Sequence, residues 1–323
     1  MFKLQFKEDD YIHYITKSTK AHNFDNISRT KAYEKFYFKY PEIKWALVAS
    51  IVSRNAGWNM TDLRLPPYEQ ILSHVEQMRL FLTYERANWL IFSDAYPQLL
   101  TYQMSVQLNK PCFHLLKYFN VSTFMIDEWI YFWQTNDQNR LMISLIINEQ
   151  NVIQQPIINN DYYKYHIFFR LPYLLQDFFL VNAIIIPTKA GQLYGQFVHD
   201  FTKISKRITL GKEIATIIFK PHIYPDLIDF IMTTETTGSR FEYEQYLSIN
   251  IPYSRPLRLL YQIHNHTPIN QSDWSRQTKV KKAWRNQVVL GDDIEIGKSF
   301  YKKRYLFYAY FYIRKMFDND IYS

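Results

Sequence analysis

Glycine is scarce in this chain, with only 7 glycines among 323 residues. Sheet proteins and nucleotide-binding folds use glycine in turns, bulges and phosphate loops, where other residues fit poorly. The sequence also lacks the motifs GxGxxG, GxSxG, HExxH and CxxC, and it has no phosphate loop with a lysine. These absences favour helices joined by short connections. They also leave the chain without a recognisable catalytic motif, and we predict no cofactor.

Cysteine is nearly absent too, and no apolar run is long and pure enough to cross a membrane. The single cysteine, Cys112, excludes an intramolecular disulfide, as expected in a reducing compartment. The most apolar window, residues 167–186, is interrupted by charged and polar residues and has the spacing of a buried helix. The first residues, MFKLQFKEDDY, lack the apolar centre of a signal peptide. We therefore expect a cytoplasmic protein.

Hydrophobic residues are plentiful, and positive charge is concentrated in one region. Hydrophobic residues make up 47% of the chain and aromatic residues 18%, which is ample for a large core. The net charge is +8; residues 276–315 contain eleven Lys or Arg and three acidic residues, so they account for all of it (11 − 3 = 8). A basic region suits an anionic partner such as nucleic acid or an acidic membrane surface. A solvated basic face with no partner has the same composition.

Apolar residues at helical spacing predict helices along nearly the whole chain. Ser28 is expected to cap the first helix, Gly57 to end the second and Pro97 to break the fourth. Ser239 and Glu242 have the spacing of a capping box. The predicted helices cover residues 29–39, 41–54, 66–82, 85–95, 99–107, 112–119, 122–135, 137–151, 162–186, 193–219, 222–233, 239–247, 255–264 and 301–317.

These helices predict an all-α fold, an irregular multi-helix globular bundle that leaves room for a minor hairpin. We expect one large helical domain over residues 1–323. Residues 151–161 are polar enough to connect two helical halves, but they are too few and too mixed in composition to establish a domain boundary.

The most informative stretch is a dense polar segment that follows an apolar helix. After the mostly apolar residues 41–52, six polar residues occur within ten positions: Ser53, Arg54, Asn55, Asn59, Thr61 and Asp62. A second polar set lies on the helix predicted over 85–95 and comprises Glu85, Arg86, Asn88 and Asp94. If the two helices pack together, the sets merge into one buried cluster. Such a cluster either satisfies polar helix ends or holds an anionic or amide-bearing ligand.

Two functional hypotheses use this cluster. The first is a helical binding or scaffold protein whose candidate ligand-binding residues are Arg54, Asn55, Asn59, Asp62, Glu85, Arg86 and Asn88. The second is a hydrolase-type enzyme that uses Arg54, Asp62 and Glu85. It requires an open pocket lined by these residues and at least one carboxylate of perturbed pKa.

Three weaker signals complete the set of candidate sites. Residues 233–240 (TTETTGSR) offer backbone amides at a helix start, which is a candidate anion site. A metal site at His166, His199 and Asp200 would require the three side chains to converge. His264 and His266, in the predicted turn HNHTP, have no companion ligands in the sequence.

The basic region offers a nucleic-acid-binding hypothesis. Its cations are interleaved with Trp274, Trp284 and the aromatic run 305–312, a pattern that can follow a phosphate backbone and stack bases. The same pattern is typical of a terminal helix docked into a core, and an anionic membrane surface is a further alternative. The candidate residues are Lys279, Lys281, Lys282, Arg285, Lys302, Lys303 and Arg304.

Three segments resemble a known family. The strings VSRNAGWNMTDL (52–63), ERANWLIFSDAYPQLL (85–100) and TGSRFEYEQY (237–246) are similar to those of the YppC-like family of bacterial proteins, and the similarity extends over most of the chain. That family is catalogued as a domain of unknown function. The resemblance therefore implies no activity, cofactor or catalytic residue.

Overall fold

The computed structural model describes residues 7–168, 183–269, 272–291 and 293–320, with side chains described up to residue 313 in the last range. Within these residues the fold is mainly helical, as predicted, with one small hairpin. The elements are α1 (Glu8–His22), α2 (Asn26–Lys39), α3 (Trp45–Asp62), α4 (Pro66–Ile71), α5 (His74–Leu108), the 3₁₀ helix η1 (Phe113–Phe119), α6 (Thr123–Thr135), α7 (Gln138–Val152), the π-helix η2 (Gln154–Ile158), α8 (Asp161–Tyr163), the π-helix η3 (Lys164–Phe168), β1 (Ala183–Pro187), β2 (Leu193–Phe197), α10 (Ile204–Ile218), α11 (Tyr224–Thr233), α12 (Phe241–Glu244), α13 (Leu257–Leu260), the 3₁₀ helix η4 (Trp274–Arg276), α14 (Lys282–Arg285) and α15 (Gly297–Asp320).

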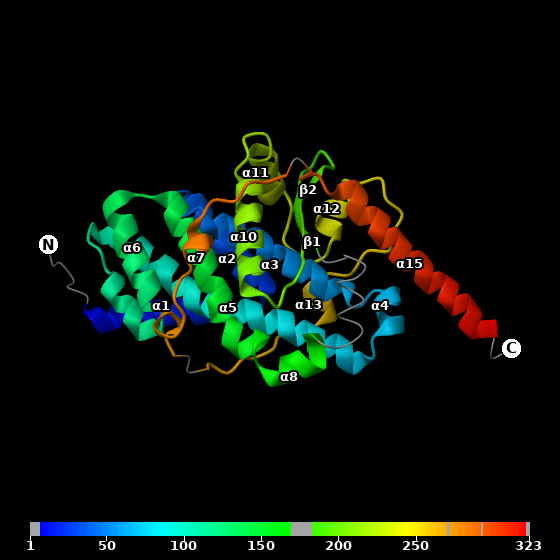
Figure 1. Ribbon diagram of the computed structural model, residues 1–323, viewed down its shortest axis with the longest axis horizontal. Helices are drawn as coiled ribbons and strands as arrows, with labels where there is room; N and C mark the ends of the chain where they lie inside the picture. The colour runs from blue at the N-terminus through cyan, green and yellow to red at the C-terminus, as the bar shows by residue number, and fades with distance from the viewer. Residues whose placement is uncertain (1–6, 169–182, 270–271, 292, 321–323) are drawn as a thin grey trace.

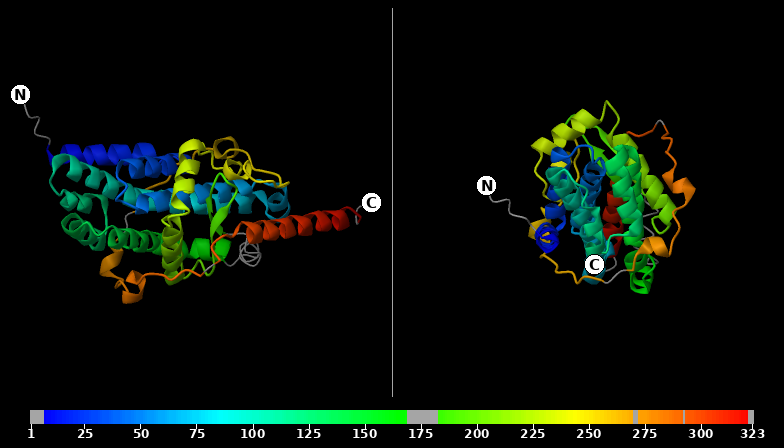
Figure 2. Two further views of the ribbon diagram at one scale, coloured as in Figure 1. Left: turned by 90° about the horizontal axis from the view of Figure 1, so that it is seen from above. Right: turned by 90° about the vertical axis from the view of Figure 1, so that its left-hand side faces the viewer.

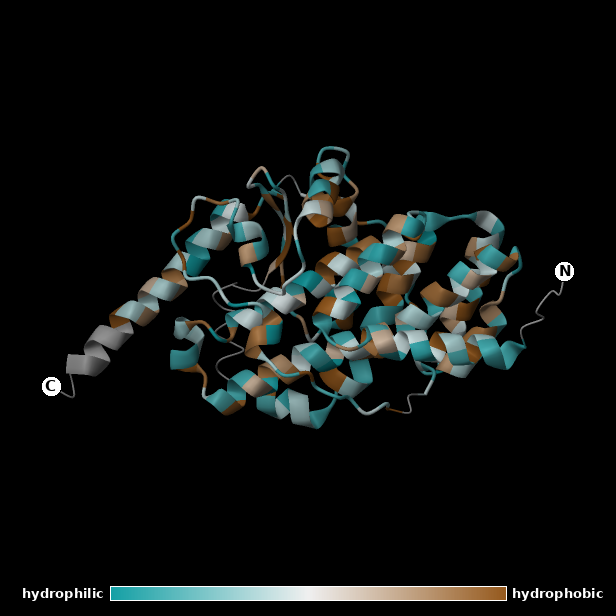
Figure 3. Ribbon diagram, turned by 180° about the vertical axis from the view of Figure 1, so that it is seen from behind, coloured by the Kyte–Doolittle hydropathy of each residue, from teal (hydrophilic) through white to brown (hydrophobic). Residues whose placement is uncertain are grey.

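The long helices form an elongated body. Helices α2, α3, α5 and α7 run along its length, and α10 crosses them to pack on α7 and α3 (Figure 1). Helix α15 extends from the opposite end to the N-terminus, as the view from above also shows (Figure 2). Brown and teal residues alternate along the body helices, as expected for helices with one buried and one exposed face (Figure 3).

Helix α3 is the most deeply buried of these elements, and α2 is its main neighbour. The side chain of Asp25 caps α2 by accepting a hydrogen bond from the backbone N–H of Ser28 at 2.7 Å, so Asp25 takes the capping role predicted for Ser28. Most of the buried hydrophobic residues form one core that runs from Ile15 to Phe311, and Ile147, Ile208 and Trp284 form a second, small cluster. The number of domains stays a prediction.

Two predicted helix ends were wrong, because tertiary packing outweighs local preference. Helix α3 continues through Gly57 to Asp62. A Cβ at Gly57 would lie 3.2 Å from the Cα of Gly238, so this glycine allows the close approach of another backbone. Helix α5 continues through Pro97 to Leu108. Pro97 is itself buried, and packing on both sides holds the helix together although one backbone hydrogen bond is lost.

Other predicted boundaries changed as well. The predicted helix 66–82 is divided between α4 and α5, because Ser73 and Glu76 form a capping box that starts a new helix. The predicted helices 239–247 and 255–264 are reduced to the single turns α12 and α13. The segment predicted over 301–317 is part of α15, which begins four residues earlier at Gly297.

A β-hairpin occupies the end of the helix predicted over 162–186 and the start of the helix predicted over 193–219, whose later residues do form α10. Residues 169–182 lie outside the described part of the chain, but residues 183–187 form β1, which pairs antiparallel with β2. The hairpin turn contains Gly191 at φ 81°, and β2 contains Gly195 at φ 147°, where a Cβ would meet the carbonyl oxygen of Ile184. A short run of isoleucines fits a buried strand as well as a helix, and here the turn glycines favour the strand. The minor hairpin that the sequence left open is therefore present.

Within the described residues, no helix has the length and apolar character needed to span a membrane.

Candidate functional site

Arg54, near the middle of α3, is fully enclosed by partners from three elements. Its guanidinium lies 3.0 Å from the Glu34 carboxylate on α2 and 3.3 Å from the Glu242 carboxylate on α12. It also donates a hydrogen bond of 2.6 Å to the Thr236 hydroxyl and lies over the Phe230 ring. Burial raises the pKa of Glu34 and of Glu242 despite the nearby arginine. The arrangement is a closed ion-pair network.

The loop predicted as an anion site already holds an anion, the carboxylate of Glu242. This carboxylate accepts hydrogen bonds from the backbone N–H groups of Thr237 and Gly238 at 2.7 and 2.6 Å. The predicted capping box between Ser239 and Glu242 is therefore wrong. The Ser239 hydroxyl instead donates a hydrogen bond to the carbonyl of Ser254. The amides of Thr237 and Gly238, which would hold an external anion at this helix start, are thus engaged within the fold.

Asp62, at the end of α3, belongs to a second closed network. Its carboxylate lies 2.5 Å from the guanidinium of Arg240, which also donates a hydrogen bond of 2.6 Å to the Asn59 side chain. Arg304 of α15 lies 4.0 Å from Asp62 and 2.8 Å from the Glu244 carboxylate. This network ties α3, α12 and α15 together. Arg304 is buried in it, so it is not on a surface that a nucleic acid could contact.

Asn55 has a structural role that the sequence did not reveal. Its side-chain amide donates a hydrogen bond of 2.8 Å to the carbonyl of Ile185, and its carbonyl accepts one of 2.8 Å from the N–H of the same residue. The side chain thus satisfies one residue of β1 as a neighbouring strand would. This pair of bonds fixes the hairpin against α3.

The second polar set, on α5, does not join the first. Glu85 is buried and lies 2.5 Å from the guanidinium of Arg29 on α2. Asn88 donates a hydrogen bond to the carbonyl of Tyr84 one turn earlier. Arg86 lies on a different face, where its guanidinium stacks on the Trp89 ring at 4.7 Å. Among the described residues, no hydrogen bond or ion pair connects Glu85 to the Arg54 or Asp62 networks.

The hydrolase hypothesis required Arg54, Asp62 and Glu85 to line an open pocket. Each of them is at most 3% exposed and is engaged by buried partners of opposite charge. These residues have the geometry of structural ion pairs. No observation in the described part of the chain favours an enzyme that uses them.

The histidine sites do not converge either. His166 is in η3, where its ring bonds the carbonyl of Tyr162. His199 and Asp200 lie in the loop after β2, and the Asp200 carboxylate pairs with Lys203. The described residues contain no group of three His, Cys, Asp or Glu side chains that could hold a metal ion. His264 and His266, in contrast, line a cavity.

The basic candidates lie on two separate elements. Lys279, Lys281 and Lys282 are exposed on the segment around α14, which packs against α7 and α10. Lys302 and Lys303 are on α15, at the other side of the hairpin (Figure 1). The ammonium group of Lys303 lies 3.8 Å from the Phe197 ring centre, and burial lowers its pKa. The structure does not unite the predicted basic region into one surface.

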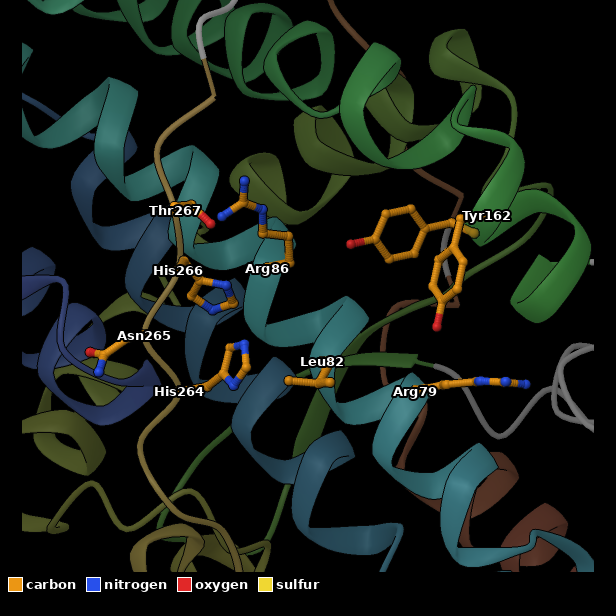
Figure 4. Close-up of a pocket in the computed structure, with 9 residues that line it drawn as sticks. Arg79, Leu82, Arg86, Tyr162, His264, Asn265, His266 and Thr267 are labelled. Atoms are coloured by element: carbon orange, nitrogen blue, oxygen red, sulfur yellow. The ribbon is translucent and has the colours of Figure 1, made fainter.

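One cavity, of about 220 Å³, includes a predicted site residue, Arg86. It lies between the N-terminal half of α5, the short helix α8 and the loop 264–267 (Figure 4). The sequence offered no signal for most of this set, because its members come from three distant parts of the chain. The lining residues are Arg79, Leu82, Arg86, Tyr162, Tyr163, His264, Asn265, His266 and Thr267.

Comparison with known proteins places the chain in a family. It belongs to the family described as "Protein of unknown function (DUF2515)", which matches residues 21–292. It is also 44% identical, over 302 residues, to the protein described as "Uncharacterized protein YppC" from Bacillus subtilis (strain 168), covering 93% of this chain and 94% of the relative. The predicted YppC-like resemblance is confirmed. No solved structure matches the chain.

Proposed function

We propose that this protein is a cytoplasmic helical binding protein that holds nucleic acid on a basic segment, defined as residues 276–285. The observation that carries the proposal concerns three lysines. Lys279, Lys281 and Lys282 are exposed, and none of them has an ion-pair partner among the described residues. Unpaired cations close together on a surface attract a phosphate backbone.

The attachment of this segment to the body supports the proposal. Trp284 is buried against Ile147 of α7 and Ile208 of α10. The ammonium group of Lys212 donates hydrogen bonds to the carbonyls of Trp284 and Asn286 at 3.1 and 2.8 Å. A segment with little regular secondary structure is thereby held in place. Fixed lysines lose less conformational freedom when they bind a partner than lysines on a free tail.

The same contacts argue for recognition of the phosphate backbone over the bases. Both tryptophans of the region are used internally, since Trp274 donates a hydrogen bond to Asn148 and Trp284 donates one to Ser205. Arg285 pairs with the buried Glu128 at 2.9 Å. The cations without a carboxylate partner are therefore lysines, of which Lys281 lies 5.7 Å from the Trp284 ring centre. Lysines bind phosphate as point charges and carry little sequence information.

The test is fluorescence anisotropy with labelled single- and double-stranded DNA and RNA over a range of salt concentrations. We expect binding at low salt, and we expect the variant Lys279→Gln/Lys281→Gln/Lys282→Gln to lower the salt slope by about 2 to 3 units on double-stranded DNA. The matched control removes three exposed lysines from α1 and α2: Lys17→Gln, Lys20→Gln and Lys35→Gln.

Three results would contradict the proposal. The first is no binding at low salt, where phosphate contacts are strongest. The second is an equal loss in the control variant, which would mean that net charge alone matters. The third is binding to vesicles with anionic lipid but to no nucleic acid, which would assign the segment to a membrane surface.

A further inference from the structure

The cavity beside α5 carries an inference that is independent of the basic segment. Its walls contain two arginines and two histidines, and none of the described residues that line it is acidic. Arg86 lies near His266 and Thr267, and Arg79 lies at the other end of the cavity, with Leu82 between them (Figure 4). Arg79 and Arg86 are seven residues apart on one helix, so their backbones are about 10 Å apart along its axis.

The arginines of the cavity differ from the fully buried arginines of the core. Arg29, Arg54, Arg240 and Arg304 each have a carboxylate partner within 3.0 Å. Neither cavity arginine has a carboxylate partner among the described residues. The Arg86 guanidinium has the Trp89 ring as its neighbour, and burial lowers its pKa. A partly desolvated cation without a counterion gains from an anionic ligand.

The nearest acidic group does not neutralise these arginines. Glu85 precedes Arg86 on α5, but its carboxylate is buried, does not line the cavity and already pairs with Arg29. His266 lies between this carboxylate and the cavity, with its Nε2 3.8 Å from Glu85 and without a hydrogen-bond partner. The negative charge of Glu85 is thus balanced by Arg29, and the positive charge of Arg86 remains available to a ligand.

The other walls offer hydrogen-bond donors and flat apolar surface. Burial and the neighbouring His266 lower the pKa of His264, so its imidazole is neutral at pH 7 and keeps one N–H donor. Thr267 adds a polar side chain next to the histidines, whereas the side chain of Asn265 points to the other side of the loop (Figure 4). Tyr162 lies on the side opposite this loop, with Leu82 between them (Figure 4), and Tyr163 lines the same cavity. One end therefore suits an anionic group, and the remainder suits an uncharged organic group.

We propose that this cavity binds a small phosphate monoester. Arg86 and Thr267 hold the phosphate, and the organic part of the ligand lies over Leu82 against Tyr162, towards Arg79. A guanidinium presents its N–H groups as a planar fork that matches two oxygens of a phosphate, and the centre of the Trp89 ring lies 4.7 Å from the guanidinium carbon of Arg86. A cavity of about 220 Å³ is below the usual size for a drug-sized molecule, so the ligand is small.

The experiment is isothermal titration calorimetry of the full chain with three probes: inorganic phosphate, adenosine 5′-monophosphate and adenosine. We expect the monoester to bind most tightly, inorganic phosphate more weakly and the uncharged nucleoside least. Binding of inorganic phosphate as tightly as the ester would overturn the assignment of an organic subsite. Absence of saturable binding by either phosphate compound at millimolar concentration would overturn the proposal as a whole.

Variants connect the binding to the cavity. Arg86→Met should weaken the monoester at least about tenfold, because a charge-assisted pair is lost. Arg86→Lys keeps the positive charge but lacks the fork of N–H groups, so its affinity for the monoester should lie between those of the unmodified protein and of Arg86→Met. Arg79→Met should weaken the ester more than it weakens inorganic phosphate. The matched control is Arg255→Met, which removes an exposed arginine outside this cavity and should leave the affinity unchanged.

Two further measurements keep the result interpretable. The first is the thermal midpoint of each variant, which shows whether it is folded. The Arg79 side chain is partly exposed and makes no hydrogen bond among the described residues, so Arg79→Met should fold normally. The variant that lacks Lys279, Lys281 and Lys282 should bind adenosine 5′-monophosphate normally. Loss of the ester in that variant would place the ligand on the basic segment and refute the cavity as its site. Unchanged affinity in Arg86→Met would refute it as well.

Discussion

Asp94 offers a direct test of how much an unpaired, largely buried carboxylate costs in stability, because it has no salt-bridge partner among the described residues. One oxygen of Asp94, on α5, accepts hydrogen bonds from the side chains of Gln98 at 2.7 Å and of Asn148, on α7, at 2.5 Å. The described residues provide no salt bridge to it. Burial raises the pKa of Asp94 from its ordinary value of 3.8 to about 7, against the smaller opposing effect of these hydrogen bonds.

This shift has a defined consequence for stability. The folded protein keeps the proton on Asp94 up to about pH 7, whereas the unfolded chain loses it near pH 4. The folded form therefore binds more protons between these values, and the free energy of unfolding falls as the pH rises through this range. A shift of roughly 3 pKa units corresponds to at most about 4 kcal/mol. Because the residue is partly exposed, we expect about 1 to 3 kcal/mol.

The change to make is Asp94→Asn, which keeps a hydrogen-bond acceptor and removes the ionisation. Relative to the unmodified protein, the variant should be more stable by about 1 to 3 kcal/mol at pH 8, by less than about half of that at pH 5, and nearly equal only below about pH 4. Urea denaturation followed by tryptophan fluorescence at several pH values measures the difference. Glu149→Gln is a companion variant, because burial raises the pKa of Glu149 to about 7 as well. Asp127→Asn, at an exposed aspartate, is the control.

The reasoning would be refuted by either of two results. One is a difference between Asp94→Asn and the unmodified protein that stays constant from pH 5 to pH 8, since the effect would then have nothing to do with ionisation. The other is a lower stability of the variant at pH 8, which would mean that the carboxylate is stabilised by its surroundings.

Three further predictions concern α3 and are measured by the same denaturation assay. Arg54→Met leaves two buried carboxylates unpaired and should cost about 3 to 5 kcal/mol, whereas a loss below about 1 kcal/mol would mean that the site is open to water. Gly57→Ala should cost about 1 to 3 kcal/mol, because the new Cβ lies 3.2 Å from Gly238; no loss would show that this backbone contact is loose. Asn55→Leu removes both hydrogen bonds to Ile185 and should cost about 2 to 4 kcal/mol. It should also speed hydrogen exchange in β1, and unchanged exchange would contradict the role given to Asn55.

The sequence predicted the helical class well because that signal is summed over many residues. Apolar periodicity over 122–135 and 137–151 closely matches α6 and α7, each of which begins after a side-chain cap. Pro97 and Gly57 misled the prediction of helix ends, because each is tolerated for reasons of packing that involve distant residues. Helix ends depend on such contacts, and hydrophobic spacing does not record them.

The sequence singled out the polar residues of α3 and α5, but it did not predict which residues they contact. The sequence left open whether Arg54, Asp62 and Glu85 form a structural cluster or line a pocket, and in the structure all three are buried in ion pairs. It did not identify the partners Glu242 and Arg240, which lie about 180 residues further along the chain, although both belong to the string RFEYE at 240–244. A pairing between segments so far apart depends on the tertiary fold. One sequence without geometry carries no record of it.

Arginines with a carboxylate partner and arginines without one lie in different parts of the molecule and have different roles. In the interior, every one of the four fully buried arginines named above has a carboxylate partner. An unpaired charge there would destabilise the fold by several kcal/mol. The same rule does not hold where water or a ligand can reach, and Arg79 and Arg86 lie in such a place. A cation that is partly desolvated and unpaired reduces stability unless something else compensates for it. Because none of the described lining residues is acidic, the two arginines of the cavity are more informative about ligand binding than the larger polar networks of the core.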